Sequence, residues 1–265
     1  MSEMPATVGN DLLAMWQSYV DEDLPLPKLL SMCALSFGNP DLTYSSTLRR
    51  IADQCFIEAL PDLGERLYDL LISRGDVLSY NDLAMNLGAR GCEEGRVTAL
   101  LDLGVAAGDA MAAMNLANRQ LSAVSEDGGI AGELAAAISS LIEQAIEGGE
   151  LSALKLRARL ALARAPSDAV AAEADLRRAI QLGQEGADVD LANLLSDLER
   201  YDEAEALYLK SVDVVAMFNL GISKIDAGDP VAARRFLLLA AASDDEEVAA
   251  DARIELDALD QASDA

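Results

Sequence analysis

The chain has 265 residues, a formal net charge of −26 at pH 7 and no histidine. Its 51% apolar content comes largely from alanine and leucine, because aromatic residues make up only 4% and are absent between Asn81 and Arg200. This composition excludes a β-sandwich, which needs β-branched and aromatic residues, and the acidic charge repels phosphates and anionic lipid, so we expect neither a nucleic-acid nor a membrane partner.

The first 44 residues are predicted to form an N-terminal helical cap. The stretches "DLPLP" (23 to 27) and "GNPD" (38 to 41) separate two helices there, because proline and glycine interrupt helical patterns. The opening "MSEMPATVGNDLLAMW" lacks the basic segment of a secretory signal. The longest obvious apolar run, at 236 to 242, is too short to span a bilayer.

The cysteine content indicates a reducing compartment. Cys33, Cys55 and Cys92 are odd in number and form no CxxC pair, whereas secreted proteins usually pair their cysteines. Sixteen arginines beside few lysines, with abundant alanine, are typical of a bacterium with a GC-rich genome. We therefore predict a cytoplasmic, bacterial protein.

Four glycines followed closely by an acid mark predicted joints between helices. They are Gly75, Gly108, Gly149 and Gly186, and each follows an apolar-periodic segment. Glycine suits the left-handed position after a helix, and an acid suits the first turn of the next one. The intervals of 33, 41 and 37 residues each have room for two helices with short loops.

The resulting pattern is a series of helix pairs. An initial pair covers about 45 to 73, with Pro61 at its joint. The first helices of the later pairs are predicted near 79–90, 109–123, 150–164, 188–198 and 213–227. Their second helices are predicted near 94–107, 131–147, 168–184, 201–211 and 230–242. Asp229 is predicted to cap the last of these with Pro230 in its first turn, and Ser167 or Asp168 to cap the helix that follows them. We expect a cap at 1–44, five or six repeats at 45–243, and an acidic capping helix and tail at 244–265, with the helix near 246–259.

Short motifs on the first helices resemble tetratricopeptide repeats, and most closely their Sel-like branch. The motifs are "AMNLG" (84–88), "AMNLA" (113–117), "LANLL" (191–195) and "MFNLG" (217–221), supported by "LLDLGVAAGDAMAAMNLA" (100–117) and "YDEAEALYLKSV" (201–212). Leu195 stands where the family pattern has glycine. The resemblance implies an all-α fold, a right-handed superhelical α-solenoid of antiparallel helix pairs. It also implies binding of a protein or peptide on the concave face and no chemistry.

The residues themselves give little support for an enzyme. Without histidine, the commonest general base and metal ligand is missing. The loop "DGGIAG" (127–132) lacks the strand and the lysine of a phosphate-binding loop and the spaced acids of a calcium loop. The acidic run "DDEE" (244–247) is most simply a solvated helix start. We predict no catalytic residue, no cofactor and no metal.

Two series of polar residues recur on the predicted first helices. In the first series, asparagine comes directly before the leucine that the motifs share, at Asn86, Asn115, Asn193 and Asn219; Lys155 takes this place in the third unit. In the second series, arginine comes three residues after that leucine, at Arg90, Arg119 and Arg159. We hypothesise that both series line part of the concave groove. Asparagine would hold a peptide backbone and arginine would meet an acidic side chain. The alternative is structural: asparagine as packing consensus, and each arginine paired with an acid of the adjacent helix.

Two other classes of function remain open from the sequence. An acidic antagonist, such as an immunity-type inhibitor or nucleic-acid mimic, would bind a basic protein through its acids and lose affinity in salt. A self-associating scaffold is a third interpretation. The sequence leaves the identity of the partner and the oligomeric state open.

Overall fold

The computed structural model describes residues 44–57, 60–124, 130, 132–164, 168–211 and 213–263. These residues hold thirteen α-helices and no strand, so the predicted all-α fold is confirmed. The predicted cap at 1–44 lies outside the described residues, apart from Tyr44. The described residues divide into two compact units: residues 44–119 with 147–149, and residues 120–146 with 150–263.

The helices follow one another through short connections. Unit 1 contains α3 (Tyr44–Ile57), α4 (Pro61–Ser73), α5 (Leu78–Ala89), α6 (Glu94–Ala106) and most of α7 (Ala110–Ser122). Unit 2 contains nearly all of α8 (Gly132–Glu147), then α9 (Ala153–Arg164), α10 (Ala169–Gln181), α11 (Ala187–Asp197), α12 (Tyr201–Tyr208), α13 (Val214–Asp226), α14 (Pro230–Ala241) and α15 (Glu246–Ser263).

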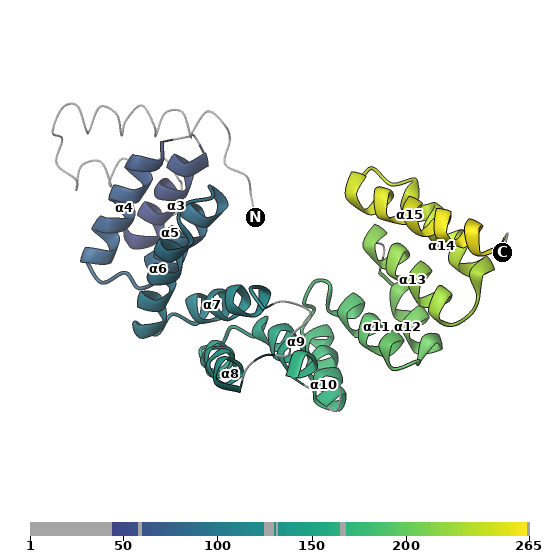
Figure 1. Cartoon of the computed structure of the whole chain (residues 1–265). Helices are drawn as coiled ribbons and strands as arrows, with labels where there is room; N and C mark the ends of the chain where they lie inside the picture. The colour runs from purple at the N-terminus through teal and green to yellow at the C-terminus, as the bar shows by residue number, and fades with distance from the viewer. Residues whose placement is uncertain are drawn as a thin grey trace. The chain divides into compact units, whose positions relative to one another are not determined.

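Each unit is a stack of helix pairs (Figure 1). In unit 1, α3 packs against α4 and α5 packs against α6, while α5 also contacts both helices of the preceding pair. In unit 2, the pairs α9–α10, α11–α12 and α13–α14 pack in the same way, and α15 packs against α14. First helices contact first helices, as α11 contacts α13. This is the predicted arrangement of a helical repeat solenoid, seen within each unit.

Small side chains allow the helices to approach closely. Alanines are fully buried at many helix contacts, for example Ala112 on α7 and Ala192 on α11. At Gly104 of α6, a Cβ atom would lie only 2.7 Å from the Cβ of Ala112 and 3.3 Å from that of Tyr80. The backbone of α6 therefore lies against its neighbours at a distance that only glycine permits.

The predicted glycine joints are confirmed. Gly75, Gly108, Gly149 and Gly186 all have positive φ, from 73° to 94°. Gly186 differs in role, because it directly precedes α11, whereas Gly183, with φ of 71°, follows the end of α10. The predicted helix 168–184 consequently ends at Gln181.

The predicted caps are confirmed in part. The Asp229 side chain accepts a hydrogen bond from the backbone N–H of Ala232, and Pro230 lies in the first turn of α14. Asp168 precedes α10 but makes no capping hydrogen bond through its side chain, and Ser167 lies outside the described residues. Two other helices depart from the expected ends: α12 stops at Tyr208, and α15 continues to Ser263.

Cys55 is a buried core residue of α3, and burial raises the pKa of its thiol to about 11. A thiol in this environment is protonated and acts as a small apolar side chain. None of the described helices combines the length and the apolar character needed to cross a bilayer.

Candidate partner-binding surface

The predicted binding residues lie on or just after the first helices of the pairs. Asn86 belongs to α5, Arg90 follows it, and Asn115 and Arg119 belong to α7, all in unit 1. Lys155 and Arg159 of α9, Asn193 of α11 and Asn219 of α13 belong to unit 2.

In unit 2, the asparagines of two successive first helices meet at one oxygen atom. The hydroxyl of Tyr208 on α12 donates to Oδ1 of Asn193 over 2.6 Å, and Nδ2 of Asn219 donates to the same Oδ1 over 3.0 Å. Tyr208 is fully buried. Asn193 thus joins its own second helix to the first helix of the next pair.

Unit 1 repeats this arrangement with an aspartate as the acceptor. The hydroxyl of Tyr68 on α4 donates to Oδ1 of Asp53 on α3, and Nδ2 of Asn86 donates to the same Oδ1 over 2.9 Å. In both units the tyrosine follows its acceptor by 15 residues. Asp53 is not among the predicted residues, because the recurring motif has asparagine at this position. A tyrosine 15 residues further along the chain is the signal that could have identified it.

Asn115 makes a related contact with the preceding first helix. Its Nδ2 donates to Oδ1 of Asn81 on α5 over 2.7 Å, and Asn81 is itself buried. The Nδ2 atoms of Asn86, Asn115 and Asn219 are therefore all used within the protein. No donor among the described residues reaches the Oδ1 atoms of these three, which leaves three amide acceptors for another molecule.

The three arginines differ in their environments. Nε of Arg119 donates to Oε1 of Glu94 over 2.9 Å, and its Nη2 bonds the second carboxylate oxygen, so it pairs with the acid of a neighbouring helix. Nη2 of Arg159 donates to Oγ of Ser122 over 3.4 Å. Arg90 is exposed and makes no ion pair with any described residue. Arg119 therefore makes the pairing with an acid of an adjacent helix that the structural alternative expects.

Lys155 reaches the loop that precedes α11. Its Nζ donates to the backbone oxygen of Glu185 over 2.9 Å and lies 3.0 Å from a carboxylate oxygen of Asp190. Both contacts lie in unit 2. Lys155 thus links α9 to α11, the first helix of the next pair, through a hydrogen bond and an ion pair. At the other aligned positions, uncharged asparagines make the links.

Exposed apolar side chains lie on the same first helices as the asparagines of unit 1. Leu78 and Met85 on α5 are 44% and 42% exposed, and Met111 on α7 is 37% exposed. Leu78 and Met85 are seven residues apart and share one face of α5. None of the three is among the predicted binding residues, because helical periodicity alone does not distinguish an exposed methionine or leucine from a core one. Methionine suits contact surfaces that adapt to different partners.

A group of charged side chains comes from α3, from the start of α5 and the loop before it, and from the residue that precedes α7. Nη1 of Arg49 lies 3.5 Å from Oδ2 of Asp82, and its Nε lies 3.4 Å from Oδ2 of Asp76. Asp109, only 4% exposed, accepts the backbone N–H of Met111 through Oδ1, while its buried Oδ2 has no hydrogen-bond partner among the described residues. Burial raises the pKa of both Asp82 and Asp109; Arg49 opposes this at Asp82, and the backbone N–H groups of Met111 and Ala112, with Arg49, oppose it at Asp109.

Replacing Asp109 with asparagine should stabilise unit 1 near neutral pH. A native pKa above the unfolded value means that the native state binds more protons, so stability falls as pH rises through the native pKa. Asparagine keeps the helix cap and removes the buried charge. We expect Tm at pH 7.5 to rise by about 2–4 °C, which corresponds to roughly 1 kcal/mol, and the gain to shrink at pH 4.

Thermal unfolding followed by circular dichroism at the two pH values measures this effect. Asp229→Asn is the matched control, since Asp229 is an exposed cap whose neutralisation should change Tm little at either pH. A lower Tm for Asp109→Asn at pH 7.5 would mean that attraction to Arg49 outweighs burial.

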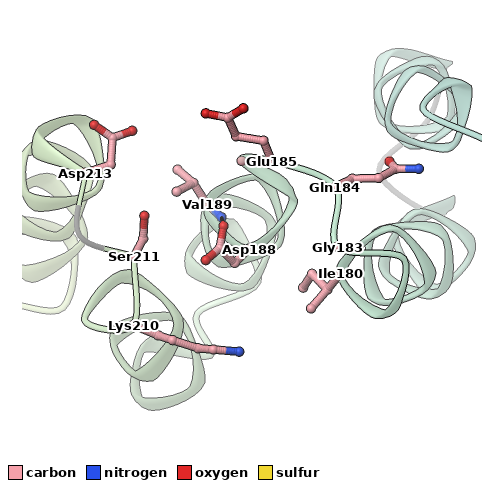
Figure 2. Close-up of a pocket in the computed structure, with 10 residues that line it drawn as sticks. Ile180, Gly183, Gln184, Glu185, Asp188, Val189, Lys210, Ser211 and Asp213 are labelled. Carbon is pink, nitrogen blue, oxygen red and sulfur yellow. Dashed lines mark hydrogen bonds between the residues drawn. The ribbon is translucent and has the colours of Figure 1, made fainter. Parts of the chain in front are cut away.

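A cleft of about 580 Å³ opens in unit 2 beside the connection before α11 and the connection before α13 (Figure 2). Its lining combines Ile180, Gly183, Gln184, Glu185, Gly186, Asp188, Val189, Lys210, Ser211 and Asp213. Asp188 and Asp213 accept backbone N–H groups at the starts of α11 and α13. These two carboxylates thus serve the helix ends. No cluster of potential metal-binding side chains occurs in the part of the chain that the structure describes.

Comparisons with known proteins identify a solved structure with a similar fold. A scan against models of protein families found no match, and a search of curated proteins found no similar sequence. Among solved structures, the chain is similar to a Sel1 repeat protein from Oxalobacter formigenes, with a TM-score of 0.56 and 14% identity over 89% of this chain and 98% of that one. The stacked helix pairs, the glycine joints and this likeness together show that the chain has the fold of a Sel1-type helical repeat protein.

Proposed function

We propose that the chain is a non-enzymatic interaction scaffold that binds an extended segment of a protein partner on the surface of its first helices. The observation that carries the proposal is that the Oδ1 atoms of Asn86 and Asn115 in unit 1, and of Asn219 in unit 2, receive no hydrogen bond from the described residues. Peptide backbone N–H groups are the donors that such acceptors fit within either unit. The repeat fold supports the general role, because stacked helix pairs offer long surfaces for binding.

The surface of unit 1 supplies three kinds of contact. Oδ1 of Asn86 and Asn115 would accept from the partner backbone, and Met85 and Met111 would contact its apolar side chains. Arg90, exposed and without a carboxylate partner among the described residues, would meet an acidic side chain of the partner. Arg119 is held by Glu94 and would shape the surface.

Unit 2 offers the same chemistry on its own first helices. Oδ1 of Asn219 receives no hydrogen bond from the described residues, Asn193 positions the Nδ2 of Asn219, and Lys155, paired with Asp190, and Arg159 are the cations of this surface. We propose a cytoplasmic adaptor that binds proteins or peptides and neither nucleic acid nor membrane. The charge of −26 keeps this adaptor soluble and repels those other ligands.

Substituting Arg90 with glutamate tests the groove directly. We expect Arg90→Glu to lower partner affinity by about tenfold to a hundredfold, since a charge-assisted contact of about 1.5–3 kcal/mol becomes a repulsion. The measurement captures partners from the native cell extract on immobilised protein, identifies them by mass spectrometry, and then titrates each purified partner. Arg74→Glu is the matched control, because Arg74 also ends a helix and is exposed, but on a second helix.

Salt distinguishes this proposal from the acidic antagonist. A groove contact that combines amide bonds and apolar burial should survive moderate salt and depend on Arg90 and Asn115. A basic partner that is released by salt and binds Arg90→Glu normally would instead support the antagonist. Binding that Arg74→Glu weakens as much as Arg90→Glu would contradict the groove.

A further inference from the structure

The second helix α14 is apolar on both of its sides. Its sequence, PVAARRFLLLAA, contains no acid and only two charged residues. One side packs on α13 and α15 and buries Ala233, Phe236, Leu237 and Ala240. A helix that is apolar all round is normally covered on all sides.

The other side of α14 faces solvent. Val231 is 82% exposed, Leu238 is 54% exposed and Leu239 is 55% exposed. With Arg235 they lie at positions i, i+4, i+7 and i+8, which share one helix face. We call these four residues the α14 stripe. Three large aliphatic side chains on one exposed face mark an interaction surface, whereas scattered ones need no explanation.

The one charge on the α14 stripe is not neutralised by a carboxylate of the described residues. The guanidinium of Arg235 lies 5.6 Å from the centroid of the Phe236 ring, a cation–π contact. Its neighbour Arg234 differs, because it pairs with Asp260 of α15. Arg235 therefore stays close to the helix and leaves the aliphatic side chains accessible.

Acidic residues flank the α14 stripe at both ends. Asp226 and Asp229 precede α14, and Asp244, Asp245, Glu246 and Glu247 follow it; all six are exposed. One cation lies at the far end, where Arg253 donates to the backbone oxygen of Ala241. An apolar centre between charged ends is the usual composition of a protein interface.

We propose that the α14 stripe is a docking surface for an amphipathic helix of a partner protein with basic residues at both of its ends. The apolar face of that helix would cover Val231, Leu238 and Leu239, and its basic ends would meet the acidic groups that flank α14. Twelve residues of α14 extend about 18 Å, so the two basic ends of the partner are separated by about three helical turns. The inference does not rest on the proposed function, because α14 is a second helix outside the first-helix surface.

A designed peptide tests the proposal with the full-length protein. The probe is a fluorescent amphipathic helix with leucines at every third or fourth position and lysines at both ends, titrated by fluorescence anisotropy. We expect binding that the double variant Leu238→Gln with Leu239→Gln weakens by about tenfold or more, since two buried leucine contacts are lost. Both side chains are more than half exposed, so the double variant should keep the thermal unfolding curve of the parent.

Two matched controls make the result specific. Leu103→Gln alters a leucine that is 51% exposed on the second helix α6 and should leave peptide affinity unchanged. A peptide with glutamates in place of the terminal lysines should bind at least about tenfold more weakly. Equal binding of the two peptides, or unchanged affinity in the double variant, would overturn the proposal.

Self-association is measured in parallel by analytical ultracentrifugation. We expect the parent protein to sediment as the same species as the double variant. A dimer that dissociates in the double variant would assign the α14 stripe to a second copy of the chain and would also overturn the proposal. Arg90→Glu should bind the peptide like the parent, which separates this test from that of the proposed function.

Discussion

Replacing Gly104 with alanine should destabilise unit 1 by about 1–3 kcal/mol, the usual cost of an added group in a packed core. The new Cβ would lie 2.7 Å from the Cβ of Ala112 and 3.3 Å from that of Tyr80. Neither atom can move by a side-chain rotation, since both are attached directly to the backbone. The contact between α6 and α7 must therefore open.

Gly95 in the same helix gives the matched control with the opposite sign. It lies in the first turn of α6, and a Cβ there would meet nothing within 4 Å. Alanine is the better helix former, so Gly95→Ala should raise the free energy of unfolding by about 0.5–1 kcal/mol. Hydrogen exchange of peptides from α6 and α7, read by mass spectrometry in increasing urea, measures both changes. A neutral Gly104→Ala would show that these helices are not closely packed.

Replacing Tyr208 with alanine should cost about 3–5 kcal/mol, the range for removing a buried aromatic ring. Tyr208 is 1% exposed and packs in one cluster with Leu195, Ala204 and Leu220, so its loss leaves a cavity among three helices. Tyr208→Phe keeps the ring and removes only the donor to Asn193. We expect that variant to lose about 1 kcal/mol, because Asn219 still donates to the same oxygen.

Urea unfolding followed by circular dichroism gives both values for Tyr208. If Tyr208→Phe were as damaging as Tyr208→Ala, the hydroxyl rather than the ring would be the main source of stability. That result would also raise the importance of Asn193, whose Oδ1 receives the bond.

Local features of the fold could be predicted because their causes lie within a few residues. The joint at Gly75 follows from the need for a left-handed residue after a helix. The cap at Asp229 follows from an acid placed directly before a proline. Each depends on backbone groups that are near in sequence, so neighbouring helices do not alter the outcome.

Contacts between helices were less accessible to sequence reasoning. The sequence aligns Arg119 with Arg90, but the pairing of Arg119 with Glu94, 25 residues earlier, depends on how α7 packs on the start of α6. The shared role of Asp53 and Asn193 was hidden because the two residues differ in type. The α14 stripe escaped notice because an apolar run does not reveal which of its sides is covered.

The acceptor shared by a tyrosine and the next asparagine has a consequence for how such a chain can change in length. Within a pair, tyrosine and acceptor are 15 residues apart in both units, whereas the asparagine of the next pair lies 33 residues away in unit 1 and 26 in unit 2. The register inside a pair is fixed, and the spacing between pairs is not. Gene duplication or deletion can therefore add or remove a whole pair, with changes in loop length accommodated between the tyrosine and the next asparagine rather than between the acceptor and the tyrosine.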